Sequence, residues 1–289
     1  MKVKLSSTQI QFILENYETK GCKYCVDNLN INKSTITSVA RRHKLRVNLD
    51  TKLKNMSKSY INIDNYTNVN DRNIAYILGL IWTDGHVTFA NNNSKTPIVK
   101  HSCVYYDSEC LTKIFGSLNW KTFKSENKKS IGKNTMVTNW ISSRELGNYL
   151  ISNNFKNKTE GTKIHESFPN LVSHFIRGLF DGDGCLTNSK SGKYMQSGIY
   201  FSSSYDQNWD YLTNILDTLN VKYVKRILSD KLGKSSQICI KDSISIYNLC
   251  EFMYKDSDEC RLERKHDKYI EFLEYKTKYT RNNRLSNIL

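Results

Sequence analysis

Two stretches of the chain, 99 residues apart, share one unusual pattern. "ILGLIWTDG" (residues 77–85) and "IRGLFDGDG" (176–184) are apolar, helix-like runs that contain a central glycine and end in Asp-Gly. A glycine inside a helix costs about 1 kcal/mol relative to alanine, so its repetition needs a physical reason. This pattern constrains the fold more than any other feature, because it predicts two equivalent helices.

The segments that follow the two stretches also correspond. Residues 104–121 match 199–222, and residues 138–151 match 238–253; each segment is typical of a strand followed by an amphipathic helix. Two copies with so long a period indicate two pseudo-symmetric halves rather than a solenoid. We therefore predict an α+β fold with a first repeat over 71–170 and a second repeat, with a basic tail, over 171–289.

The glycines also predict how the two helices meet. Small residues lie four positions apart in both stretches: Gly79 with Thr83, and Gly178 with Gly182. Such spacing lets two helix backbones approach closely. The final glycines, Gly85 and Gly184, suit the left-handed conformation that ends many helices. We expect the two helices to pack side by side and each to turn directly into a strand.

Asp84 and Asp183 would then lie at the same end of this helix pair. Paired carboxylates suit a hard divalent cation, Mg²⁺ or Mn²⁺, which prefers oxygen ligands. A single Asp-Gly would be read as a residue that only caps a helix end. Two in register within a duplicated frame favour a metal site.

The first 47 residues show three short helical stripes and one C-x-x-C spacing, Cys22 and Cys25. A zinc site needs four ligands, and no second Cys or His pair follows at a suitable distance. The two cysteines share a helical face with Val26 and Leu29, so we expect them to be buried as small apolar residues.

These stripes predict a helix-turn-helix module over 1–47, with Asn32 as the N-cap of its third helix. Residues 1–60 hold twelve of the 43 Lys and Arg but only four of the 28 Asp and Glu. The polar face of the third helix and its flank supply the candidate DNA contacts: Ser34, Thr35, Ser38, Arg41, Arg42, Lys44 and Arg46. A basic three-helix module that does not bind DNA is the alternative. Residues 48–70 are interpreted as a basic linker.

The charge of the whole chain, +15, also favours a polyanionic partner, because basic surfaces gain free energy by displacing counterions from phosphates. A basic protein from an AT-rich genome would show similar lysine and asparagine usage. No apolar run approaches 18 residues, and the eight cysteines lack a disulfide spacing. We expect a soluble intracellular protein with reduced cysteines and no membrane partner; the sequence does not choose between cytoplasm, organelle and nucleus.

The two Asp-Gly stretches in their duplicated context make the chain resemble the LAGLIDADG homing endonucleases, in the two-repeat, single-chain form, over about residues 71–275. The resemblance implies a pseudo-twofold αββαββα fold, a saddle of antiparallel sheets over the DNA major groove, and a monomer. It also implies metal-dependent hydrolysis of both strands of a long double-stranded DNA target. In that family the aspartate before the last glycine binds metal, which maps onto Asp84 and Asp183, with the main-chain carbonyls of Thr83 and Gly182 assisting.

The family also places a lysine near each active site. The matching candidates are Lys158 and Lys265, with Lys156, Lys163 and Arg264 as rivals. Such a lysine polarises the attacking water or stabilises phosphate charge. Trp82, Thr83 and Arg177 depart from the family pattern. Trp82 and Thr83 would loosen the helix crossing, which would weaken the first site and make strand cleavage unequal.

Two other functions use the same fold. One is a group I intron maturase, which would bind intron RNA, and the other is a transcription regulator that binds DNA without cutting. The presence of both acids argues against the regulator, which needs no metal ligands.

Overall fold

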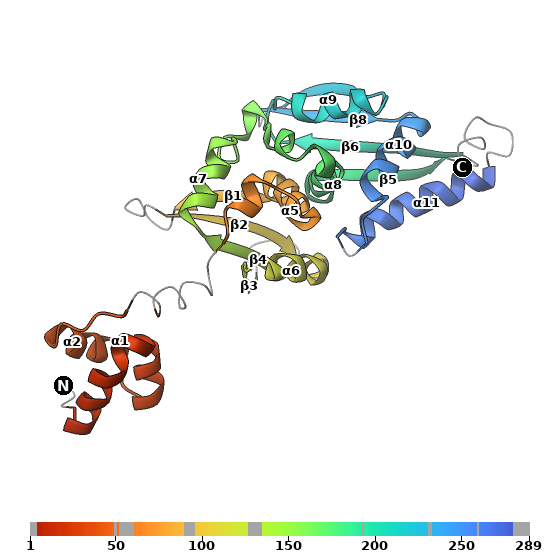
Figure 1. Ribbon diagram of the computed structural model, residues 1–289. Coiled ribbons are helices and arrows are strands. Elements are labelled where there is room, and N and C mark those ends of the chain that lie inside the picture. Colours follow the sequence, from red (N-terminus) through yellow and green to blue (C-terminus); the bar gives the residue numbers. More distant parts are fainter. Residues whose placement is uncertain are drawn as a thin grey trace. The chain divides into compact units, whose positions relative to one another are not determined.

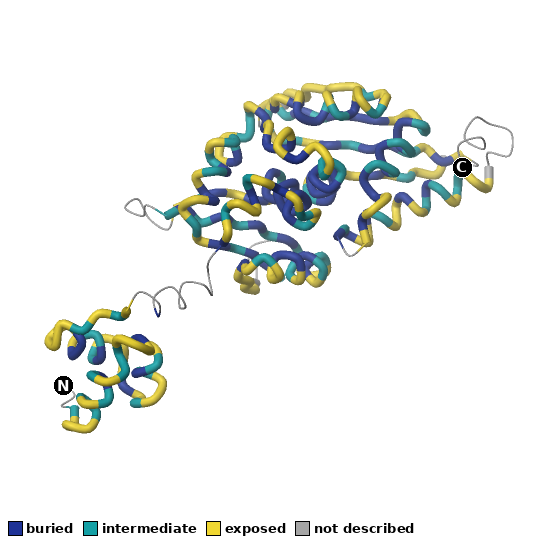
Figure 2. The backbone as a smooth tube through the Cα atoms, viewed as in Figure 1, coloured by how far each residue is buried: buried dark blue, intermediate teal, exposed yellow. Residues whose placement is uncertain are grey.

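A computed structural model describes residues 5–48, 51, 61–89, 96–126, 135–191, 194–230, 233–258 and 260–279 (Figure 1). The chain divides into two compact units, Met1–Tyr60 and Ile61–Leu289. Each unit has its own apolar core, shown by the dark segments in Figure 2.

The first unit contains α1 (Ser7–Leu29) and α2 (Lys33–Arg42). Helix α1 is interrupted at Gly21, whose φ of 84° is outside the helical range, so the unit has the three helical segments that the stripes predict. Asn32 caps α2 as predicted, because its side chain accepts a hydrogen bond from the Thr35 amide at 2.9 Å. Cys25 is buried in the small core and Cys22 packs against it half-buried, in agreement with their expected apolar role.

The second unit contains two copies of the predicted αββαββα order. The first copy consists of α5 (Arg72–Thr83), β1 (Gly85–Phe89), β2 (Pro97–Val104), α6 (Ser108–Ser117), β3 (Lys121–Glu126), β4 (Thr135–Ser142) and α7 (Arg144–Ser152). The second consists of α8 (Val172–Asp183), β5 (Gly184–Ser191), β6 (Tyr194–Ser203), α9 (Asp210–Thr218), β7 (Val224–Asp230), β8 (Gly233–Ile240) and α10 (Ser243–Tyr254). Both sheets are antiparallel and share one strand order, β1-β2-β4-β3 and β5-β6-β8-β7. The duplicated α+β fold is confirmed.

Two parts of this unit differ from the sequence interpretation. The linker interpretation does not hold for residues 61–70, where Ile61, Tyr66 and Val69 are buried in the core around the short helix α4 (Asp64–Thr67). Trp120 fixes this segment by donating from Nε1 to the Tyr66 hydroxyl at 3.0 Å. A further helix, α11 (Glu263–Tyr279), follows the second copy and runs along β5 (Figure 1). Residues 280–289 of the basic tail lie outside the described residues.

Helices α5 and α8 pack side by side between the two sheets (Figure 1). A Cβ atom on Gly178 would overlap the Tyr76 carbonyl oxygen and lie 3.0 Å from the Gly79 Cα, and one on Gly79 would overlap the Phe175 carbonyl oxygen. The predicted backbone-to-backbone crossing is therefore confirmed. Thr83 does not loosen it, because its hydroxyl fits against Gly182, which has no side chain.

The expected left-handed conformation of Gly85 and Gly184 is wrong. Gly184 is extended, with φ −81° and ψ 157°, and Gly85 also lacks a positive φ. Glycine is needed there for space instead. A Cβ on Gly85 would lie 2.5 Å from the Ile81 carbonyl oxygen, and one on Gly184 would lie 2.6 Å from the Phe180 carbonyl oxygen, because each strand starts directly against the last turn of its helix.

Among the helices that the structure describes, none has both the length and the apolar character needed to span a bilayer. No disulfide joins any of the eight cysteines, all of which belong to the described part of the chain.

Candidate active site and nucleic-acid interface

Asp84 and Asp183 lie at the same end of the helix pair. Asp84 follows the last residue of α5, and Asp183 is the last residue of α8. A Cβ on Gly182 would lie 3.3 Å from the Asp84 carboxylate, which shows how closely the two helix ends approach. Both carboxylates reach solvent. The sequence-predicted pair is therefore brought together.

Burial raises the pKa of both carboxylates. Although Asp84 is exposed, the protein atoms around its carboxyl group partly desolvate it, and this desolvation, with the charge of Asp183, raises the Asp84 pKa to about 6. The pKa of Asp183 is also raised, by burial. Lysines 158 and 265 act in the opposite direction on both pKa values. Two carboxylates and two lysine ammoniums thus meet at this site, and burial opposes the charged form of all four groups.

Both candidate lysines reach this point from elements outside the helix pair. The Lys158 ammonium donates to the carbonyls of Thr83 at 2.9 Å and Gly85 at 2.7 Å, at the end of α5. The Lys265 ammonium lies within 3.1 Å of four carbonyl oxygens at the end of α8: those of Phe180, Asp181, Gly182 and Gly184. Each lysine therefore binds the carbonyls that a helix leaves without partners at its C-terminus, where the helix dipole is negative.

Burial lowers the pKa of both lysines. The Lys158 pKa falls to about 8, although Asp183 and Asp84 oppose the shift, and the Lys265 pKa also falls. Asp183 has the largest charge effect on Lys158, whereas Asp84 feels Lys265 more than Lys158. Each lysine thus holds the end of one motif helix and acts electrostatically on the acid of the other.

The rival cations do not hold the ends of the motif helices, although Arg264 lines a cavity beside Asp84. Arg264 forms a two-pronged ion pair with Asp107, with Nε–Oδ1 at 2.8 Å and Nη2–Oδ2 at 2.7 Å, which ties the second repeat to the first. Lys156 and Lys163 are exposed, and the Lys156 ammonium lies 5.6 Å from the centre of the Phe89 ring. None of the three contacts the ends of α5 or α8 through a hydrogen bond in the described residues.

Two cavities flank the acids, one on each side of the helix pair. A cavity of about 290 Å³ is lined by Asp183, Lys158, Trp82 and Tyr205, among others. A cavity of about 250 Å³ is lined by Asp84, His101, Asp181 and Arg264, among others. Because Asp84 and Asp183 are equivalent by the internal repeat, the cavities are pseudo-symmetric, yet their other linings differ. Neither ring nitrogen of the fully buried His101 has a hydrogen-bond partner among the described residues.

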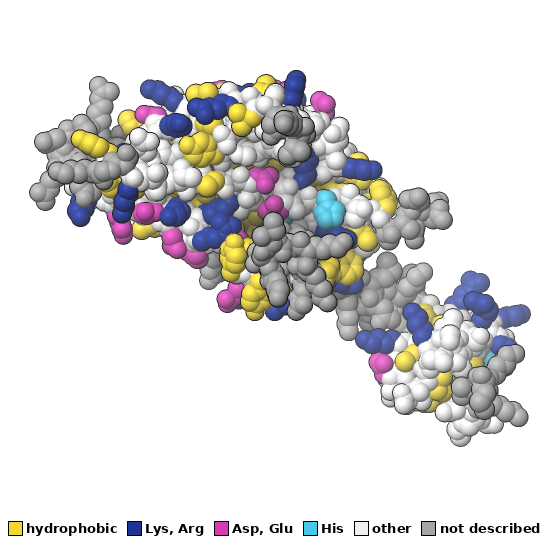
Figure 3. Space-filling model, turned by 180° about the vertical axis from the view of Figure 1, so that it is seen from behind, with side chains coloured by type: hydrophobic (Ala, Val, Ile, Leu, Met, Phe, Trp, Pro, Cys, Tyr) yellow, Lys and Arg dark blue, Asp and Glu magenta, His cyan; other side chains and the backbone are white. Residues whose placement is uncertain are grey.

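The strand register, which the sequence could not fix, identifies the sheet faces that no helix covers. Val99 and His101 of β2 point to the helices and are buried, so Lys100 and Ser102 point away. Cross-strand partners share a face, which places two rows on the uncovered faces: Lys100, Trp140 and Lys121 in the first sheet, and Ser202, Gln237 and Arg226 in the second. The view from behind shows a small central group of acidic side chains with Lys and Arg around it (Figure 3).

The candidate DNA contacts of the first unit lie on or just after α2. Ser34, Ser38, Arg41, Arg42, Lys44 and Arg46 are exposed, and Thr35 is half-buried. Their side chains are thus accessible on one surface of this unit, opposite the buried Ile36, Val39 and Ala40.

Sequence reasoning missed a buried polar network on α8. Arg177 is fully buried, and its guanidinium binds the carbonyls of Cys260 and Met253, both at 2.6 Å. Asp181, also buried, accepts from the Tyr76 hydroxyl at 2.7 Å and the Leu262 amide at 2.9 Å. Burial, partly offset by Lys265, raises the Asp181 pKa to about 6. A charged residue inside an otherwise apolar helix run was the available sign of this network.

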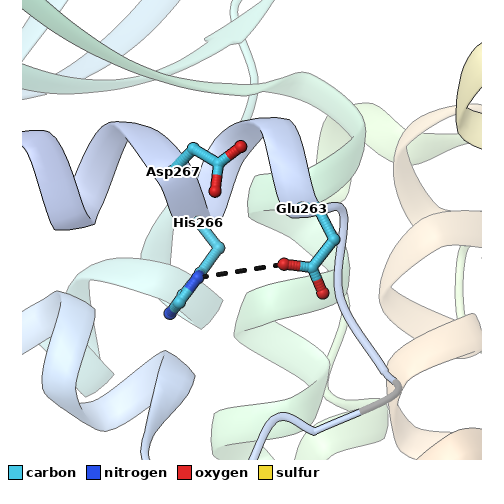
Figure 4. Close-up of side chains that lie close together, drawn as sticks. All are labelled: Glu263, His266 and Asp267. Carbon is cyan, nitrogen blue, oxygen red and sulfur yellow. Dashed lines mark ion pairs between the residues drawn. The ribbon is translucent and has the colours of Figure 1, made fainter.

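One cluster of potential metal ligands lies away from the helix ends. Glu263, His266 and Asp267 come from the first turns of α11 (Figure 4). The two acids are exposed, and the His266 ring packs edge-on against Tyr254 at 4.9 Å. Exposed acidic groups on one helix turn are ordinary, so the cluster is not assigned a role.

Residues 170–252 match the family model of the LAGLIDADG-like domain. The second repeat is a LAGLIDADG-like domain. The matched range begins just before α8 and ends within α10, so this LAGLIDADG-like domain includes Asp183 and the complete second sheet. The first repeat lies outside the match and is related to it by the shared element and strand order.

Three solved structures illustrate the similarity in fold. The homing endonuclease I-WcaI bound to its DNA recognition sequence is 14% identical, over 78% of this chain and 96% of that chain, with a TM-score of 0.49. The LAGLIDADG homing endonuclease I-GzeII in complex with a DNA target is 12% identical, over 72% and 93%, with a TM-score of 0.45. The LAGLIDADG meganuclease I-AabMI bound to uncleaved DNA is 14% identical, over 69% and 89%, with a TM-score of 0.43. No curated protein matches the chain. Identities and scores this low transfer no function.

Proposed function

We propose that the protein is a site-specific DNA endonuclease of the homing type, which hydrolyses both strands of a long, asymmetric duplex target. The observation that carries the proposal is the placement of Asp84 and Asp183 at the adjoining ends of α5 and α8, between two sheets with uncovered faces. Both halves lie in one chain, so we propose that it acts as a monomer. The different side chains on the two sheets support an asymmetric target.

The residues at the helix ends fit a divalent cation, Mg²⁺ or Mn²⁺. Burial and the charge of Asp183 raise the Asp84 pKa, and a bound cation would stabilise both carboxylates in their ionised form. Asp84 and Asp183 would hold the ion, with the carbonyls of Thr83 and Gly182 as further oxygen donors. Those carbonyls already accept from lysines, but each oxygen has a second lone pair. Such an ion lowers the pKa of bound water and stabilises charge that develops on a phosphate.

Lys158 and Lys265 have two roles in this proposal. They donate to the carbonyls on both sides of each aspartate, those of Thr83 and Gly85 and those of Gly182 and Gly184, and so would hold the backbone that carries the two carboxylates. Their positive charges also lie where the negative charge of a phosphate would be added, and preorganised charge of this kind stabilises a transition state. The basic residues on the uncovered faces, Lys100, Lys121 and Arg226, would contact the DNA backbone, while their neutral neighbours read base edges.

The helix-turn-helix of the first unit would lengthen recognition by contacting DNA through the α2 surface. Replacement of Arg41 and Arg42 by alanine is expected to weaken duplex binding and to lower the slope of log K against log salt by about one per cation removed. Fluorescence anisotropy at several salt concentrations measures this slope. The double variant Glu15→Ala/Asp27→Ala, which removes acids of the same unit, is the control and should not lower it. An unchanged slope in the arginine variant would leave this unit as a packing module.

The function is tested by a cleavage selection on a randomised duplex library with Mg²⁺, beside the variant Asp84→Asn/Asp183→Asn. We expect cut ends clustered on one long motif with the native protein and none with the variant. Specific duplex binding without cutting by either protein would leave the transcription regulator. A preference for folded intron RNA over duplex DNA would favour the maturase.

A further inference from the structure

Arg177 is an unusual residue for the centre of a packed helix. Its side chain is 0% exposed, and its hydrogen bonds go to two main-chain carbonyls and, at 2.7 Å, to Nδ1 of His174. Its guanidinium also lies 5.3 Å from the centre of the Tyr76 ring. Burial of a cation without a hydrogen-bonded carboxylate is costly. The reason for this buried arginine should therefore lie in the chain segment to which the two carbonyls belong.

These carbonyls lie at the two ends of the segment that connects α10 to α11. Arg177 binds this segment at Met253, where α10 ends, and again at Cys260. Asp181, one helical turn further along α8, accepts from the amide of Leu262 at 2.9 Å. Three hydrogen bonds that involve two buried side chains thus attach the connector to α8 at both of its ends.

Lys265 follows three residues after Leu262, in the first turn of α11. Its side chain is only 7% exposed, and its ammonium lies at the end of the same helix, α8, whose middle carries Arg177. Because only two residues separate Leu262 from Lys265, attachment of the connector at Leu262 also restricts the position of Lys265 at the start of α11. We propose that Arg177 and Asp181 are positioning residues for Lys265: they fix the α10–α11 connector so that the Lys265 ammonium reaches the end of α8.

In the described residues of the first repeat no hydrogen bond from α5 makes the equivalent attachment, and Trp82 instead packs its ring against Phe155, in the segment that leads to Lys158. Leu78 and Trp82 stand at the positions equivalent to Arg177 and Asp181, and both are buried apolar side chains. The segment that carries Lys158 is held from another direction, since the Asn208 amide donates to the Thr159 carbonyl at 2.8 Å. The two candidate lysines therefore depend on different contacts, and only Lys265 should respond to a change at position 177.

The reactivity of lysine side chains tests this directly and needs no DNA. The protein is exposed to a short pulse of an acetylating reagent, and the modification rate of each lysine is read by mass spectrometry. In Arg177→Met we expect Lys265 to react at least about tenfold faster than in the native protein, because the connector opens locally, while Lys158 changes less than about twofold. The matched control is Leu78→Ala, which weakens the equivalent position of α5 and should not expose Lys265 selectively.

Arg177→Lys is the second variant, for the case that Arg177→Met does not fold. It keeps the charge but lacks the planar fork that reaches two carbonyls, so we expect a smaller exposure of Lys265 in the same direction. Native-like protection of Lys265 in a folded variant, or equal exposure of Lys158 and Lys265, would overturn the proposal.

The effect on cleavage rests on the proposed function and is measured separately, as the rate of nicking of each DNA strand. Arg177→Lys is expected to slow the same strand as Lys265→Met, by at least about tenfold relative to the other strand. Equal slowing of both strands contradicts a selective role for Arg177. A native protein that cuts no duplex refutes the nuclease function, while the acetylation result still decides whether Arg177 positions Lys265.

Discussion

Helices α5 and α8 occupy equivalent places in the two repeats but are anchored by different chemistry. On α5 every residue from Ile74 to Trp82 is buried, and all of them are apolar apart from the hydroxyl of Tyr76 and the indole N–H of Trp82. On α8 the equivalent stretch buries Arg177, Asp181 and His174, all joined by hydrogen bonds to other elements or to each other.

The residues at position 82 and its equivalent, 181, show the contrast most clearly. Trp82 packs its ring against Phe155 and donates from Nε1 to the Tyr211 hydroxyl at 3.0 Å. Asp181 is a carboxylate that receives hydrogen bonds from Tyr76 and the connector before α11. The helix crossing and the terminal acids are the same in both repeats, whereas the outward contacts differ. The duplication therefore fixes the geometry of the shared site, and each half is free to secure it in its own way.

The largest expected effect comes from the part that the two helices share. Gly178→Ala and Gly79→Ala each place a methyl group into the backbone of the other helix, which cannot move without separating the pair. We expect each to lower the free energy of unfolding by about 3 kcal/mol or more. Urea denaturation measures the change.

Gly116→Ala in α6 is the control, because an added Cβ there meets nothing within 4 Å. It should stabilise the protein by up to about 1 kcal/mol, since alanine favours the helix. If Gly178→Ala were as harmless as Gly116→Ala, the direct backbone contact at the crossing would be wrong.

A smaller effect on stability distinguishes the buried carboxyl contact of α8 from the indole contact of α5. Tyr76→Phe removes a hydrogen bond to Asp181, and Tyr211→Phe removes the acceptor of the Trp82 indole. The Asp181 pKa, about 6 in the folded protein, is raised above its ordinary value, so its ionisation costs stability as pH rises through 6. Without the Tyr76 hydroxyl that cost grows. We expect Tyr76→Phe to destabilise by about 1–3 kcal/mol at pH 8 and by less at pH 5.

Thermal unfolding of both variants at the two pH values checks this prediction. The loss in Tyr211→Phe should be the same at pH 5 and pH 8, because the partners of its hydroxyl in the described residues are Trp82 and Gln207, neither of which titrates. An equal pH dependence in both variants would mean that Asp181 is not the group responsible.

The shared features were the ones that the sequence could predict. The small residues at Gly79 and Gly178 predict the helix crossing, and the repeated Asp-Gly predicts that Asp84 and Asp183 lie close together. Both predictions depend only on local pattern and on the duplication. The strand–helix alternation likewise gives the αββαββα order. Lys158 and Lys265 could be named only through a family resemblance, because no local pattern separates them from neighbouring cations.

The features particular to one half could not be predicted in the same way. Arg177 reaches carbonyls 76 and 83 residues away in the chain. Backbone carbonyls have no sequence identity that would mark them as partners, so a sequence shows only that a buried arginine needs some acceptor. The conformation of Gly85 and Gly184 was mispredicted for a related reason. The sequence alone does not distinguish a glycine that is required because there is no space for a Cβ atom from one that is required for a positive φ.

The smallest effect concerns the acids themselves, and it distinguishes Asp84 from Asp183. Cation binding needs both carboxylates ionised, and the Asp84 pKa is about 6, so affinity should fall as pH falls through this value. Ca²⁺ serves as the cation in a calorimetric titration. The dissociation constant for Ca²⁺ is expected to rise about tenfold per pH unit below 6. Asp183→Asn should weaken binding and also move this midpoint to lower pH, because the charge of Asp183 contributes to the raised pKa of Asp84. His86→Gln is the control for the imidazole that follows the first motif. A midpoint that follows His86 instead of Asp183 would remove Asp84 as the group that limits cation binding.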